Sequence, residues 1–131
     1  MIEHQEKNCY YQSEITYKGI FADKFLAEGI MLIFPDLSEV LEIKEYSFLV
    51  KKGTLLHDIH PGDFITLDEN LFTIAQVGEI AQKNLIELGH ITLKFGKPAS
   101  SVMPGTIYLE STQVPSVDKG TILRILKAPS Q

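Results

Sequence analysis

Apolar and polar residues alternate with a period of two in several short stretches of the chain. The clearest case is residues 91–95, where apolar residues alternate with Thr92 and Lys94, and residues 13–18 alternate in the same way. This period is typical of a strand with one buried face. Further short apolar runs that we interpret as strands occupy residues 29–34, 46–50, 64–67, 71–77, 107–109 and 122–126. About eight short strands predict an all-β fold, an antiparallel barrel-like domain or a sandwich.

One segment has the period of a helix. Ala81, Leu85 and Leu88 are spaced i, i+4 and i+7, so they share one face of a short helix near residues 79–88. Gly89 follows where a left-handed helix cap is needed. Residues 35–41 are a second, weaker candidate for a turn of helix.

Four glycines precede Thr or Asp and then an apolar residue, at Gly53, Gly62, Gly105 and Gly120. Two of them follow proline, in Pro61-Gly62 and Pro104-Gly105. Proline presets the second position of a type II turn and glycine supplies the positive φ of the third. We therefore expect each of these sites to start a strand from a tight turn.

Length and charge exclude several classes of function. The chain has 131 residues, enough for a single domain over 1–131, with a polar tail at 1–9 that we expect to be flexible. Its net charge is −5 and Arg124 is its one arginine, which argues against nucleic-acid binding. No apolar run approaches the roughly 20 residues of a membrane span, and the N-terminus does not resemble a secretion signal. With Cys9 as the single cysteine, the sequence predicts a cytoplasmic protein without an internal disulfide.

The candidate chemistry rests on four histidines, because phosphate-binding glycine loops and serine-nucleophile motifs are absent. His57 and His60 are the one close pair, but the turn that His60-Pro61 imposes does not favour a metal site. We expect neither a metal nor a cofactor. Asp63 lies across the turn from His60 and could orient its imidazole as a nucleophile; the alternative is a histidine that only hydrogen-bonds the local backbone. His90 shares the less buried face of its strand with Thr92, as a surface residue or a pocket wall.

Lys51 and Lys52 follow the strand at 46–50 and would attract an anionic ligand or an acidic partner, or simply guard a strand end.

Three blocks of sequence then resemble a known family. The first block contains Glu45-Tyr46, Phe48 and the later His60-Pro61-Gly62. The second block covers residues 75–95 and contains Asn84, Glu87-Leu88-Gly89-His90 and Thr92. The third block is Pro104-Gly105-Thr106. The chain is similar in these blocks to the glucitol/sorbitol-specific IIA component of the bacterial phosphoenolpyruvate-dependent sugar phosphotransferase system.

That resemblance implies a barrel-like fold and a cytoplasmic phosphocarrier. Such a protein accepts a phosphoryl group on a histidine from the phosphorylated histidine carrier protein and passes it to a IIB component for sorbitol uptake. The resemblance places the acceptor in a His-x-His segment after the Tyr-x-Phe strand, where this chain has Val50-Lys51-Lys52. Either His60 or His90 is the catalytic residue, or the acceptor lies elsewhere, or the chain is a non-catalytic binding or regulatory barrel that has lost its phosphohistidine.

Overall fold

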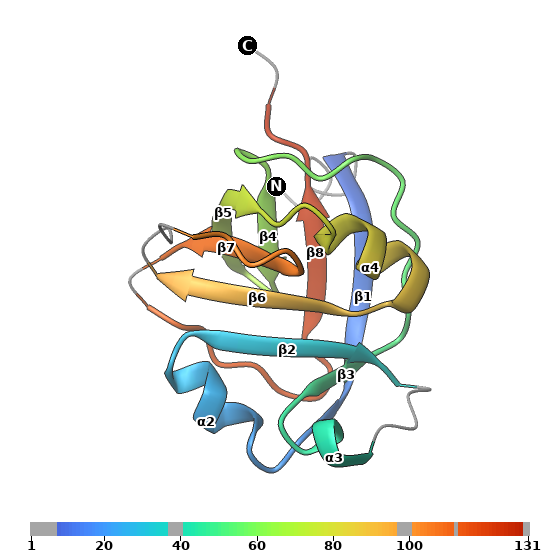
Figure 1. Ribbon diagram of the computed structural model, residues 1–131, viewed down its shortest axis with the longest axis vertical. Coiled ribbons are helices and arrows are strands. Elements are labelled where there is room, and N and C mark those ends of the chain that lie inside the picture. The colour runs from blue at the N-terminus through green and yellow to red at the C-terminus, as the bar shows by residue number, and fades with distance from the viewer. Residues whose placement is uncertain (1–7, 37–40, 97–100, 112, 130–131) are drawn as a thin grey trace.

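The computed structural model describes residues 8–36, 41–96, 101–111 and 113–129, and its strands form a closed barrel. Neighbouring strands follow the order β1-β3-β2-β6-β7-β5-β4-β8 (Figure 1). The elements, in chain order, are β1 (Cys9–Lys18), α2 (Ala22–Ala27), β2 (Ile30–Pro35), α3 (Leu41–Lys44), β3 (Phe48–Val50), β4 (Phe64–Leu67), β5 (Asn70–Val77), α4 (Ala81–Leu88), β6 (Ile91–Gly96), β7 (Thr106–Glu110) and β8 (Ile122–Leu126). Each of the eight strands overlaps a segment that the period of two or a short apolar run predicted.

The prediction of an antiparallel barrel is wrong, because two of the strand pairs are parallel. β2 pairs with β3 in parallel and β6 pairs with β7 in parallel, whereas the other six pairs are antiparallel. The chain between β2 and β3 returns through α3, as a parallel pair requires a crossover connection. The alternation of apolar and polar side chains shows which face of a strand is buried, but it does not show whether the strand runs parallel or antiparallel to its neighbour.

The prediction of one helix is incomplete, since the described residues contain three. α4 covers the predicted segment and ends at Gly89, whose φ of 68° is left-handed as expected. α2 has only six residues, of which Ala22 and Leu26 are buried, so it has too few turns to show a period. Of the weaker candidate at 35–41, residues 37–40 lie outside the described part of the chain. None of the described helices has the length and apolar character needed to cross a membrane.

The tight turns are only partly as predicted. Gly62 has φ +95° and the Asp63 N–H donates to the His60 carbonyl at 3.1 Å, which is a type II turn with Pro61 at its second position. Gly105 does not have the predicted positive φ. A Cβ at position 105 would lie 3.3 Å from the Asn84 Nδ2 of α4, so a larger residue would have to displace that side chain by a few tenths of an ångström.

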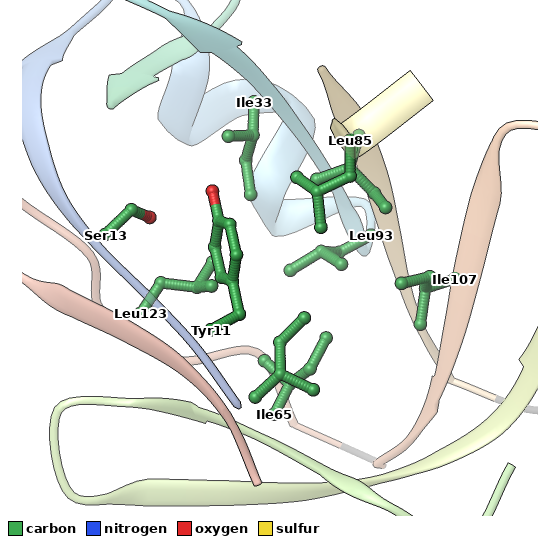
Figure 2. A pocket seen from close by; sticks show the side chains of 10 residues that line it. Tyr11, Ser13, Ile33, Ile65, Leu85, Leu93, Ile107 and Leu123 are labelled. Carbon is green, nitrogen blue, oxygen red and sulfur yellow. The ribbon is translucent and has the colours of Figure 1, made fainter. Parts of the chain in front are cut away.

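The interior of the barrel is packed with aliphatic side chains around one ring. Figure 2 shows Tyr11 among residues contributed by strands and by Leu85 of α4, with Ser13 beside it. The space left between them is about 10 Å³, no more than one water molecule needs. This space is therefore too small for a ligand of the size of a sugar.

Candidate functional site

The ends of three strands meet at one corner of the barrel. β2 and β3 are parallel, so their carboxyl ends lie together, with Pro35 opposite Val50. β6 is antiparallel to β2 with Ile33 opposite Ile91, which brings the start of β6 to the same place (Figure 1). The Asp36 N–H donates to the Val50 carbonyl at 2.8 Å and closes this end. We call this region the β2–β3–β6 corner, and it consists of Phe34, Pro35, Val50, Lys52, Gly89 and His90.

The chain leaving β3 passes from the core to the surface within two residues. Val50 is fully buried and lies opposite Ile15 of β1, so a side chain at position 50 is out of reach of another protein. Lys52 is exposed. Its Nζ donates to the carbonyl of Glu87, near the end of α4, at 3.4 Å. The accessible position in the segment that the resemblance singled out is therefore Lys52, not Val50.

Gly89 joins α4 to the corner in a conformation that other residues rarely adopt. Its N–H donates to the Leu85 carbonyl at 3.1 Å and closes the helix. A Cβ at this position would lie 3.2 Å from Cγ of Lys52 and 3.3 Å from Cβ of Pro35. The stem of Lys52 thus lies directly against Gly89, one residue before His90.

His90 presents a half-buried imidazole at this corner, on the less buried face of its strand as predicted. The ring stacks on Phe34, with centroids 4.3 Å apart and an interplanar angle of 14°. Burial lowers the pKa of His90 below its ordinary value, because desolvation disfavours the charged ring. Burial therefore favours the neutral imidazole, which has one unprotonated nitrogen, as a nucleophilic histidine requires.

The Pro104-Gly105-Thr106 block supports α4 from the other side. The Ile80 N–H donates to the Pro104 carbonyl at 3.0 Å, and the Gly78 N–H donates to the Thr106 carbonyl at 2.8 Å. These bonds fix the start of α4 on the start of β7. Because α4 ends at Gly89, these bonds also position the corner. Two of the sequence blocks that resemble the family, residues 75–95 and Pro104-Gly105-Thr106, are thus in direct contact.

His60 lies in a different group of contacts, with His57. The two exposed rings meet edge to face at 5.8 Å, and His57 also contacts the ring of Tyr10 at 5.1 Å. No contact recorded for the described residues joins this pair to His90. His4 lies outside the described residues.

The Asp63 carboxylate bonds to groups other than the imidazole of His60. It accepts the Tyr10 hydroxyl at 2.6 Å, the Ala128 N–H at 2.9 Å and, at 3.4 Å, the main-chain N–H of His60. Asp63 is buried, so it holds the turn and the chain after β8 together. Among the described residues, Asp63 thus bonds to the main chain of His60 and has no recorded bond to its imidazole.

The two groups of histidines differ in the charge around them. Lys52 is exposed at the corner that contains His90 and Lys51 is exposed next to it, whereas Asp58 and Asp63 flank His60. Asp36 closes the same end of the corner, so the corner differs from the turn in having a cation that can bind an anion, and not in lacking carboxylates. Among the described residues there is no group of three or more His, Cys, Asp or Glu that could hold a metal ion.

Some residues of this site could not be identified from sequence. The strand period places Phe34 in a strand but does not show that its ring faces His90, since that depends on the pairing of β2 with β6. Nor does it show that Lys52 packs on Gly89. The one useful indication was the expected left-handed cap at Gly89, which marks where α4 turns toward β6.

Comparison with known proteins first defines the structural class. The crystal structure of a PTS system IIA component from Enterococcus faecalis V583 is similar with a TM-score of 0.77 over 88% of this chain and 98% of that one, at 23% identity. The barrel is therefore the fold of a IIA component.

The family follows from the sequence. The family model for the PTS system glucitol/sorbitol-specific IIA component matches residues 10–124. Two curated relatives, the glucitol/sorbitol-specific EIIA components of Shigella flexneri and Escherichia coli K12, are each 30% identical over 114 residues, which is 87% of this chain and 92% of theirs. The chain belongs to the glucitol/sorbitol-specific IIA family of the sugar phosphotransferase system.

Proposed function

We propose that this chain is a working IIA phosphocarrier and that His90 carries the phosphoryl group. In this proposal the chain acts in the cytoplasm, receives phosphate from the phosphorylated histidine carrier protein and transfers it to a IIB component for glucitol or sorbitol uptake. Family membership supports the role, and the β2–β3–β6 corner supports the residue.

The observation that carries the choice of His90 is its half-buried ring, stacked on Phe34, one residue after the glycine on which the exposed Lys52 packs. Of the histidines in the described residues, His90 alone lies at the corner that contains Lys52. His60 remains the second candidate, in a turn whose nearby charges are carboxylates. Val50 has no group to phosphorylate and is fully buried.

The transfer is a displacement at phosphorus. The unprotonated nitrogen of His90 attacks, a new N–P bond forms, and the N–P bond to the donor histidine breaks with its electron pair returning to the donor ring. The donor ring carries a proton on its other nitrogen, so it leaves as neutral imidazole. The proton on the other nitrogen of His90 is then lost to solvent. Such a reaction needs a positioned nucleophile and stabilisation of charge on the phosphoryl oxygens, and little other machinery.

The test is phosphorylation of the full chain by phosphoenolpyruvate, enzyme I and the histidine carrier protein, followed by intact mass at neutral pH. We expect a gain of one phosphoryl group that disappears on acidification. His90→Gln should abolish the gain, whereas His60→Gln and His57→Gln, matched in chemistry, should retain it.

Two results would contradict the proposal. Loss of the phosphoryl group in His60→Gln but not in His90→Gln would move the acceptor to the turn. No phosphorylation of the unaltered chain, with a known IIA component labelled in the same mixture, would leave the non-catalytic barrel as the function.

A further inference from the structure

We infer that Lys52 is the group that binds the oxygens of the phosphoryl group while it is transferred to and held on His90. This inference rests on the proposed function, because it assigns Lys52 a role in that reaction. Nothing in the family membership supplies this residue, since the resemblance places a histidine in the segment where this chain has lysine.

The position of Lys52 is fixed by its stem rather than by an ion pair. Its Cγ and Cδ lie 3.2 and 3.4 Å from where a Cβ of Gly89 would be. Its Nζ reaches back to the Glu87 carbonyl at 3.4 Å. The ammonium group is therefore held beside the short turn that leads from α4 into His90.

The charge of Lys52 is not neutralised in the described part of the chain. Both ion pairs recorded there belong to Lys18, and the carbonyl of Glu87 is a neutral acceptor at the long limit of a hydrogen bond. A phosphoryl oxygen would be a stronger partner, because it carries a charge opposite to that of the ammonium group and such N–H···O bonds are short. Lys52 can exchange the carbonyl for the anion without breaking a salt bridge.

Lys52 acts in this account as a point charge and not as a proton donor. In phosphoryl transfer the negative charge is spread over three equatorial oxygens, and a cation placed beside them lowers the barrier. The ring of His90 is held on Phe34, so nucleophile and cation are positioned by separate contacts. No proton needs to leave Lys52.

Lys51 provides a matched control. It has the same chemistry and is also exposed one residue away, but no contact of its side chain with the corner is recorded. If general positive charge at this surface were enough, Lys51 and Lys52 would be equivalent. The structure predicts that they differ.

The experiment measures the initial rate of phosphorylation by the histidine carrier protein, and the lifetime of the isolated phosphoprotein, for Lys52→Gln, Lys52→Arg and Lys51→Gln. We expect Lys52→Gln to slow phosphorylation by about 10- to 100-fold, mainly in kcat, as loss of a donor to a developing oxyanion does. Lys52→Arg should restore most of the rate, since it keeps the charge. Lys51→Gln should change the rate less than about 3-fold, mainly through association with the partner.

The outcomes separate the two proposals. If the unaltered chain is phosphorylated on His90 and Lys52→Gln has the rate and lifetime of the parent, the role of Lys52 is wrong and the proposed function stands. Equal losses of phosphorylation rate in Lys52→Gln and Lys51→Gln would also refute the role of Lys52, since positive charge anywhere on this surface would then explain the effect. If the unaltered chain is not phosphorylated at all, the proposed function itself fails. Equal thermal unfolding of the variants shows that a rate loss is not a loss of fold.

Discussion

Gly89→Ala perturbs the turn on which both His90 and Lys52 depend. Gly89 has a left-handed φ of 68°, where a non-glycine residue costs about 1–2 kcal/mol. The new methyl group would also lie 3.2 Å from Cγ of Lys52 and 3.3 Å from Cβ of Pro35. The lysine stem is flexible and can move away, so we expect destabilisation of about 1–2 kcal/mol together with displacement of Lys52.

Gly120→Ala separates the destabilisation caused by backbone strain from the displacement of Lys52. Gly120 also has a left-handed φ, of 96°, but a Cβ there would meet no atom within 4 Å. It therefore adds backbone strain without contact to the corner. Both variants should lose similar stability, but only Gly89→Ala should also slow phosphorylation.

Thermal unfolding and the rate of phosphorylation are measured on the same samples. For a chain of this size about 1 kcal/mol corresponds to a fall in Tm of roughly 3–5 °C. The reasoning is refuted if Gly89→Ala unfolds at the temperature of the parent. It is also refuted if the two alanine variants slow phosphorylation equally, because the contact with Lys52 would then have no effect.

Four further predictions concern Tyr10, His90 and Lys18. Tyr10→Phe removes the hydrogen bond to Asp63 and should cost about 1–3 kcal/mol in urea unfolding; equal stability of the variant would contradict this. Burial and, second, the hydrogen bond to Asp63 raise the pKa of Tyr10. The protonated Tyr10 therefore contributes its full stability below the ordinary tyrosine pKa near 10, and this stability should fall as the pH rises above that value. Tyr10→Phe should reduce this loss of stability at high pH. Burial lowers the pKa of His90, so the stability gained from its neutral ring is present above about pH 6.5 and is lost as the pH falls from there through the folded pKa. NMR titration of the ring should give a pKa below the ordinary value for histidine, and a pKa at or above that value would contradict this. Lys18→Met breaks exposed pairs with Asp23 and Asp118 and should cost no more than about 1 kcal/mol, less in high salt.

The positions of the strands could be predicted because some, such as β6, have one buried face, and others, such as β3 and β7, are short apolar runs buried along most of their length. In β6 buried and half-buried residues alternate along Ile91–Gly96, as the sequence pattern does. The direction of the strands could not be predicted, because the same alternation is produced by parallel and antiparallel neighbours. The parallel pairing of β2 with β3 is nevertheless what brings Pro35 next to Val50 and creates the corner.

The candidate site was predictable only in part, for the same reason. Parity along β6 placed His90 on a half-exposed face, and the structure agrees. Its partner Phe34 is 56 residues away in the chain (90 − 34) and becomes a neighbour only through strand pairing. Asp63 shows the opposite case: it is near His60 in sequence, but its carboxylate bonds to the distant Tyr10 hydroxyl. Local spacing therefore indicated a pairing that long-range packing replaced.

The measurement that tests the central claim most directly is the location of the phosphoryl group. Cleavage after lysine at neutral pH gives the peptide 84–94, in which His90 is the one histidine, and the peptide 53–83, which contains His57 and His60. After phosphorylation by the histidine carrier protein, the account predicts the added mass of one phosphoryl group on peptide 84–94. The same mass on peptide 53–83, with 84–94 unmodified, would contradict it.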